Sequence, residues 1–184
     1  IAGAARAEVL RGPFSVLYGN SSGGVIALFS APATRREIDA DADVGSFGLR
    51  LGRVGVSLPL DGGLDLQAHV SQAEIDGFRP QSAARKKQAN ARLGWRGASD
   101  TVTLLVNGLD QPAQDPLGLT RAQFELGPAQ TAQQAIDFNT RKNTRQTQAG
   151  ATWQHRFEDG ALRETQLMAY AGKRSATQWL AIPA

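Results

Sequence analysis

Histidines and carboxylates are the side chains of this 184-residue sequence whose types could support catalysis or hold a metal ion. The two histidines, His69 and His155, are far apart in the sequence, and the chain contains no cysteine. Neither histidine has the spacing to a carboxylate that would indicate a metal site or a general base. The sequence therefore predicts no catalytic residue, no metal site and no covalently bound cofactor, and we expect a protein that is not an enzyme.

Two further patterns imitate binding sites. Alternating carboxylates at Asp39, Asp41 and Asp43 could suggest calcium, but they lack the glycine turn and terminal glutamate of an EF-hand loop. They are better interpreted as the solvated face of a strand. Gly19 and Gly24 have the outer spacing of a phosphate-binding loop, yet Val25 occupies the position that needs lysine.

The most informative run is residues 8–26, which read EVLRGPFSVLYGNSSGGVI. Val9 and Leu10 can pack on a core, whereas Arg11 brings a charge that needs carboxylate partners if it is buried. The following Gly-Pro pair ends the strand, because proline lacks the ladder donor and glycine permits a tight turn. Alone, this pattern is also compatible with a strand and turn of a soluble α/β protein.

The same run closely resembles the end of the plug domain in TonB-dependent outer-membrane receptors. The hallmark of that family is a strand reading roughly I-E-V-L-R-G-P, then L-Y-G, then a Gly-Gly pair before an apolar strand. In that family the arginine of the motif forms ion pairs with glutamates of the barrel wall, and the resemblance implies this role for Arg11. The sequence does not identify the glutamates that would pair with it. The resemblance also implies structural or coupling roles for Glu8, Arg11, Gly12, Pro13, Tyr18, Gly19, Gly23 and Gly24.

Composition excludes some classes of protein and leaves others open. Apolar residues make up 41% of the chain and the net charge is +3, without a basic block, so we expect no nucleic-acid partner. The longest apolar run, residues 25–29, is too short for a membrane helix. A membrane β-barrel remains compatible with this composition, because its strands are apolar only at alternate positions.

From residue 37 onward the sequence alternates between apolar and polar residues in segments of about ten residues. In residues 64–71, for example, Leu64 and Leu66 share one face while Asp65 and Gln67 share the other. His155 is a misfit on an apolar face. About seven strands are predicted, at residues 37–45, 50–58, 64–71, 88–96, 101–107, 148–157 and 162–174.

The connections between these segments alternate in length. Residues 60–63, 97–100 and 158–161 are tight turns, whereas residues 74–87 and 110–144 are long; residues 46–48 are a short connection at the long-loop end. All eight prolines fall at predicted strand ends or in connections. Short turns at one end and long loops at the other are typical of an outer-membrane barrel.

We therefore predict an all-β fold: part of a plugged antiparallel transmembrane β-barrel, preceded by the C-terminal part of a plug domain. Residues 1–33 would belong to the plug and residues 34–184 to an incomplete barrel, since such barrels have about 22 strands. Trp95 and Trp153 suit an aromatic girdle near the tight turns. A soluble sandwich is the alternative, but its inner face should be richer in Leu, Ile and Phe to fill a layer about 10 Å thick.

The resemblance implies a function in energy-coupled uptake. Such receptors bind a scarce ligand, most often a ferric siderophore, at the surface of a Gram-negative cell and release it when the inner-membrane TonB complex acts on the plug. The partners of a receptor of this kind would be the TonB complex, outer-membrane lipid and a small iron chelate. Extracellular loops gather the ligand in this family, which makes candidates of Arg79, Arg121, Arg141 and Lys142.

Three alternatives remain open from the sequence. The ligand could be vitamin B12, haem or a glycan. A passive porin or adhesin would explain the strands but leaves residues 8–26 without a role. An outer-membrane enzyme would need a catalytic constellation that this part of the chain does not display.

Overall fold

The computed structural model describes residues 5–12 and 23–182, which form two antiparallel sheets. The first is the hairpin β1 (Arg6–Arg11) and β2 (Gly24–Phe29). The second contains seven strands in sequence order: β3 (Glu37–Gly45), β4 (Leu49–Pro59), β5 (Leu64–Ile75), β6 (Ala84–Arg96), β7 (Asp100–Gln114), β8 (Arg141–Arg156) and β9 (Glu164–Trp179). Every strand of the second sheet pairs with its neighbour in sequence, as expected of a barrel wall.

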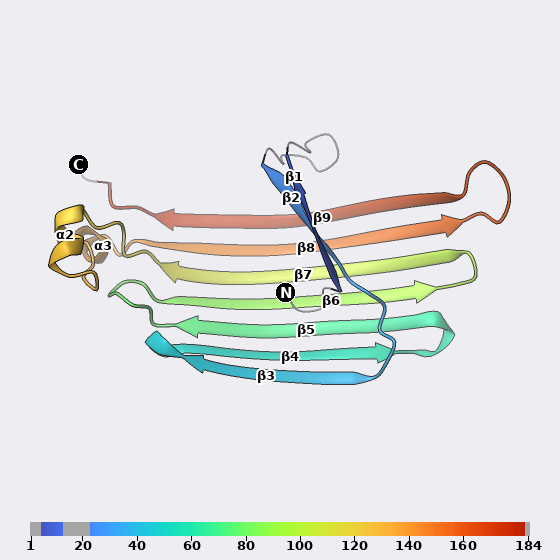
Figure 1. The fold of residues 1–184 in the computed structure, drawn as a ribbon, viewed down its shortest axis with the longest axis horizontal. Helices are drawn as coiled ribbons and strands as arrows, with labels where there is room; N and C mark the ends of the chain where they lie inside the picture. The colour runs from blue at the N-terminus through green and yellow to red at the C-terminus, as the bar shows by residue number, and fades with distance from the viewer. Residues whose placement is uncertain (1–4, 13–22, 183–184) are drawn as a thin grey trace.

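The two ends of the large sheet differ as the sequence predicted (Figure 1). At one end lie the short turns, including the 3-10 turn Asp61–Gly63. At the other end lie the 3-10 turn Ser46–Gly48, the loop at residues 76–83, and the long β7–β8 connection with helices α2 (Arg121–Leu126) and α3 (Gln133–Asp137). We call these the turn end and the loop end.

The cross-strand register separates the side chains into an apolar and a polar face. One row joins Leu66, Leu93 and Leu104 across β5, β6 and β7. The next position along each strand gives Gln67 and Arg92, which face the opposite side. A strand places successive side chains on opposite faces, so the alternation in the sequence becomes two chemically distinct surfaces.

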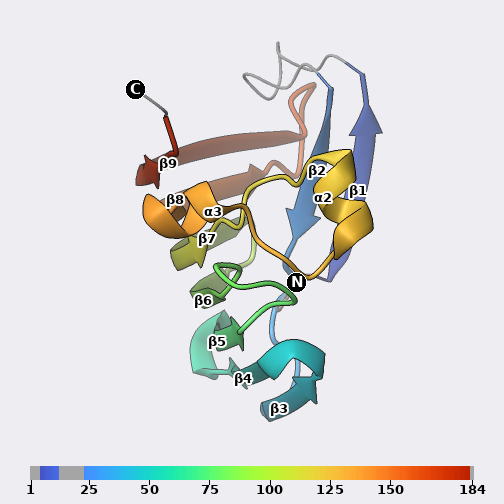
Figure 2. The ribbon, with the colours of Figure 1, turned by 90° about the vertical axis from the view of Figure 1, so that its left-hand side faces the viewer.

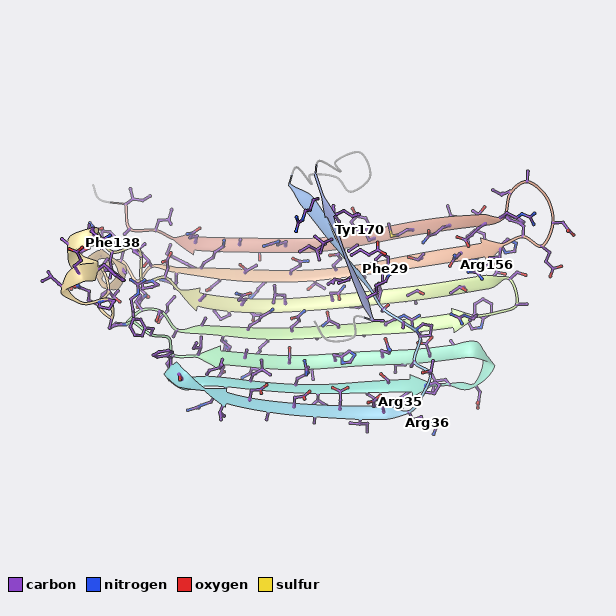
Figure 3. All side chains as sticks on the ribbon, in the orientation of Figure 1. Phe29, Arg35, Arg36, Phe138, Arg156 and Tyr170 are labelled. Carbon is purple, nitrogen blue, oxygen red and sulfur yellow. The ribbon has the colours of Figure 1, made fainter. Side chains whose placement is uncertain are left out.

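The hairpin lies to one side of the curved sheet and crosses its strands (Figures 1 and 2). Leu28 and Phe29 of β2 line a hollow together with Gln67, His69 and Asn90, so the hairpin covers the polar face. We call this the inner face and the apolar one the outer face. Figure 3 shows Phe29 over the middle of the sheet, with Arg35, Arg36 and Arg156 at the turn end and Phe138 at the loop end.

Very little of the described chain forms an apolar core. Ala33 and Ala135 are its only buried apolar residues, while Val54 and Val70 on the outer face are 51% and 56% exposed. Both edges of the sheet, β3 and β9, are unpaired among the described strands, so the sheet does not close. No helix in the described part of the chain is long and apolar enough to cross a membrane.

The predicted strands were correct in number but too short at the loop end. β5 continues to Ile75, β7 to Gln114, and β8 begins at Arg141, so the loops are shorter than predicted. The reason is that outer-face positions there are polar, which removes the alternation used to recognise a strand. Pro112, predicted to lie in a connection, belongs to β7 and pairs with Asn143 of β8. On the other side of β7, the ladder to β6 is interrupted at Pro112, because proline has no N–H to donate.

The outer face carries tryptophans next to the turns, as predicted. Trp95 and Trp153 flank Val102 in one row, and the two residues are 39% and 38% exposed. The Trp95 indole donates to the Gly62 carbonyl at 3.2 Å, and the Trp153 indole donates to the Asp100 carboxylate at 2.9 Å. These bonds satisfy the polar end of each ring and leave its apolar part on the outer face.

Candidate functional site

The inner face beneath the hairpin is lined by amides. A hollow of about 380 Å³ lies between β2 and strands β5 to β8. Leu105 of β7 is apolar although it lies on the polar face, and it lines this hollow together with Leu28 and Phe29 of the hairpin. The polar side chains of the hollow include Gln67, Gln88, Asn90, Asn107, Gln146 and Gln148.

His69 lies in this hollow with neither ring nitrogen bonded to any described residue, although both atoms are buried. Gly55 separates it from Asp39: a Cβ added at Gly55 would lie 2.3 Å from Asp39 Oδ1 and 2.5 Å from His69 Nδ1. The glycine therefore lets the carboxylate and the imidazole approach each other. Within residues 5–12 and 23–182, no group of three or more His, Cys, Asp or Glu side chains could hold a metal ion.

At the turn end, a buried ion pair holds the segment that leaves the hairpin. Asp65 Oδ1 accepts a hydrogen bond from the backbone N–H of Ala33 at 3.0 Å, and the same oxygen is bonded to the Arg92 guanidinium. The side chains of Asp65 and Arg92 are only 10% and 8% exposed. We call Ala33, Asp65 and Arg92 the linker anchor, since they fix the hairpin-to-sheet connection on the inner wall.

The linker anchor has room because its neighbour on β6 is a glycine. Gly94 pairs directly with Asp65. A Cβ at position 94 would lie 2.3 Å from Asp65 Oδ2 and 2.7 Å from both terminal nitrogens of Arg92. Any side chain there would displace the ion pair, so Gly94 is part of the same arrangement.

At the loop end, the structure brings together two of the four predicted ligand-contact residues. Arg79 and Arg121 line one open hollow of about 560 Å³ together with Phe78 and Phe124. The Arg79 guanidinium donates to the Leu117 carbonyl at 2.9 Å, which ties the β5–β6 loop to the long β7–β8 connection. Two guanidinium groups that line one hollow form a surface suited to an anion.

Helix α2 places Arg121 at the rim of this hollow. The helix begins at a capping box in which Gln123 N–H donates to Thr120 Oγ1 at 3.3 Å and Thr120 N–H donates to Gln123 Oε1 at 2.9 Å. Arg121 forms an ion pair with Glu125 at 2.5 Å, and its side chain is 87% exposed. Its charge is therefore presented to solvent.

The other two ligand-contact candidates lie elsewhere. The Arg141 guanidinium is 3.8 Å from the centre of the Trp179 ring and donates to the Asn139 carbonyl at 2.8 Å. Lys142 is exposed on β8, opposite Ala113 and Gln178. The structure thus does not bring these two residues to the hollow that Arg79 and Arg121 share.

The described part of the plug-like motif forms the hairpin β1–β2. Glu8 pairs with Arg6 at 3.2 Å. Arg11 lies opposite Gly24 and is exposed, and no carboxylate of residues 5–12 or 23–182 lies within salt-bridge distance of it. Val9, predicted to pack on a core, is 65% exposed, because the described residues place no apolar layer over that face of the hairpin.

Two motif glycines adopt backbone conformations that favour glycine. Gly12 and Gly24 have φ angles of 117° and 141°. A Cβ at Gly24 would lie 2.5 Å from the Leu10 carbonyl oxygen, so the strands could not pair as closely with another residue, whereas a Cβ at Gly23 would meet nothing within 4 Å. The motif residues Pro13, Tyr18 and Gly19 lie outside the described residues.

Comparison with known proteins agrees with this architecture. No protein-family model matches the chain. A solved structure of the ferric citrate transporter FecA in its unliganded form is similar over 97% of this chain, with a TM-score of 0.78 and 20% sequence identity. The chain spans 28% of the length of the FecA chain. At this identity the similarity shows the fold, which is that of a fragment of the FecA chain and agrees with the barrel architecture that the resemblance of residues 8–26 implied; FecA itself is a transporter.

Proposed function

We propose that this chain is part of a TonB-dependent receptor that takes up iron across the outer membrane of a Gram-negative bacterium. Residues 1–33 would form the end of the plug, and residues 34–184 the first strands of the barrel. One observation carries the proposal: a sheet that is apolar outside and polar inside holds a hairpin against its polar face, in a fold shared with the ferric citrate transporter FecA.

The dimensions of the outer face support a membrane location. Along β5 the outward-facing residues are apolar from Leu64 to Val70 and become polar at Gln72. The seven residues from Leu64 to Val70 extend roughly 23 Å along the strand at about 3.3 Å per residue. Transmembrane barrels carry an apolar band about 25 Å tall.

The proposed ligand is an anionic ferric chelate, a ferric siderophore in the broad sense. The hollow lined by Arg79 and Arg121 supplies two positive charges and two aromatic rings at the loop end, where the ligand would arrive. Arg141 and Lys142 would add to the positive potential there without contacting a ligand in the same hollow. The description of FecA as a ferric citrate transporter is consistent with this ligand class.

Release of the ligand would depend on movement of the plug, which the TonB complex would pull through a plug segment outside this chain. Arg11 and the motif glycines would take part in seating the plug. The linker anchor would hold residue 33 to the wall, so that the plug moves while its connection to β3 stays in place. The chemistry is binding and conformational release.

Deletion of the gene for the intact receptor tests this proposal. Under iron limitation, cells that carry the receptor should bind a ferric siderophore at their surface, and the deletion strain should lose this binding and recover it on complementation. Unchanged binding and uptake of every ferric chelate tested in the deletion strain would contradict the proposed function.

A further inference from the structure

The outer face changes character at one height along four consecutive strands. Gln72, Lys87, Asp110 and Arg145 pair directly with one another across β5, β6, β7 and β8. Between the row of Trp95, Val102 and Trp153 and this row, the outward residues of the four strands are apolar or small. On the loop side they are polar or charged except for Pro112, so the row marks a boundary.

Basic side chains gather at this boundary. Five of them lie on the outer face at or next to the row, and all five are exposed. We call them the outer basic belt: Arg50, Arg85, Lys87, Arg145 and Lys173. Two carboxylates accompany them, Glu74 between Arg50 and Arg85, and Asp110 between Lys87 and Arg145.

The belt retains its positive charge. Within the described residues, its one ion pair joins Arg145 to Asp110 at 3.5 Å, with 76% of the arginine side chain exposed. Arg85, Lys87 and Lys173 form no ion pair with any described residue. Their positively charged groups are therefore available to bind a partner on the outside of the wall.

We propose that the outer basic belt binds the phosphate groups of anionic lipids, whose acyl chains lie against the apolar band beside it. The proposal rests on the proposed function, because it requires the outer face to contact a bilayer. Charge and position both favour this occupant: the cations stand where the apolar band ends, which is the depth of lipid headgroups. Arginine and lysine both bind phosphate, arginine through two parallel hydrogen bonds.

The inner face provides a matched control on the same strands. Lys86 and Arg174 lie next in sequence to Lys87 and Lys173 but belong to the opposite face by register. The control residues therefore carry the same charge as the test residues and lie at nearly the same position along the strands, but on the other side of the wall. A partner in the bilayer can reach Lys87 and Lys173 but cannot reach Lys86 and Arg174.

The experiment measures lipid binding by the intact receptor in neutral detergent, by native mass spectrometry with phosphatidylglycerol and phosphatidylcholine as probes. The double variant Lys87→Gln/Lys173→Gln should lose its preference for phosphatidylglycerol by roughly 30-fold, from about fivefold per cation. The control Lys86→Gln/Arg174→Gln should keep it. Inorganic phosphate at millimolar concentration should not displace the lipid, because it has no chains to pack on the band.

Three results would overturn the inference. These are equal losses in the two double variants, no preference of the native receptor for the anionic lipid, and full displacement by inorganic phosphate. Reconstitution into phosphatidylcholine vesicles separates this inference from the proposed function. If the receptor inserts but shows no headgroup preference, only the proposed lipid binding by the outer basic belt is wrong. If the receptor never inserts, the proposed membrane location is wrong as well.

Discussion

The turn end and the loop end of the molecule use the same chemistry, an arginine beside a carboxylate, in opposite ways. At the turn end the Asp65–Arg92 pair is about nine-tenths buried and holds the backbone of Ala33. At the loop end the Arg121–Glu125 pair is largely exposed, at 87% and 60%, on a short helix. Burial makes the first pair a fixed structural connection, while exposure leaves the second free to exchange its partner for a ligand.

The largest expected effect comes from breaking the buried pair. In the intact receptor, Asp65→Ala leaves the Arg92 charge buried without a partner, which should cost about 3–5 kcal/mol in the free energy of unfolding. It also removes the acceptor for Ala33 N–H, so trypsin should cut faster after Arg35 and Arg36. Denaturant unfolding in detergent and limited proteolysis measure the two effects.

Asp61→Ala is the control for this prediction, since Asp61 is exposed in the turn Asp61–Gly63 of the same end. It should leave both readouts unchanged. A loss of stability for Asp65→Ala as small as that of Asp61→Ala would mean that the linker anchor has no structural importance.

A smaller effect is expected from filling the space beside the pair. Gly94→Ala places a methyl group where Asp65 Oδ2 would be 2.3 Å away, and should destabilise the receptor by about 1–3 kcal/mol through forced displacement of the pair. Gly108→Ala on β7 is the matched control, because a Cβ there meets nothing within 4 Å. Equal unfolding midpoints for the two variants would contradict the described geometry.

The loop end should respond in binding rather than in stability. Replacing Arg79 or Arg121 with Gln removes a charged donor from the shared hollow, and each change should weaken binding of an anionic ferric chelate by roughly tenfold. Arg163→Gln at the turn end changes the charge equally and should not alter affinity. Titration of intrinsic fluorescence gives the dissociation constants; equal losses for all three variants would point to long-range charge alone.

The smallest effect concerns the exposed pair itself. Glu125→Gln removes the partner of Arg121 at i,i+4 spacing, and the stability of the receptor should change by less than about 0.5 kcal/mol. Chelate affinity should stay the same or rise, since the arginine is then unpaired. A loss of stability comparable to that of Asp65→Ala would remove the distinction between the two ends.

The sequence predicted the wall well where one face of the sheet is apolar and the other polar. Seven strands and their two faces follow from the alternation of residues such as those at 64–71, and Glu37–Gly45 was placed at its observed bounds. Strand ends at the loop end were missed because outward positions such as Lys87 and Arg145 are polar there, and alternation no longer distinguishes strand from loop.

The site was less predictable, because it depends on pairing between distant residues. Asp65 was assigned to the polar face, but its contact with Arg92 depends on the β5–β6 register, and the bond from Ala33 depends on the path of the linker. Arg79 and Arg121 meet because two loops fold together. His155, a misfit by pattern, is explained by its 2.9 Å contact with Asp100 and its edge-to-face packing on Phe157.

Uptake of an iron-loaded siderophore by cells that carry the intact receptor, with and without a proton uncoupler, tests the central claim most directly. The account predicts that the uncoupler abolishes uptake while surface binding persists, because binding needs only the loop end and release needs energy applied to the plug. Flux of many small solutes that is insensitive to the uncoupler would contradict the account and indicate a passive pore.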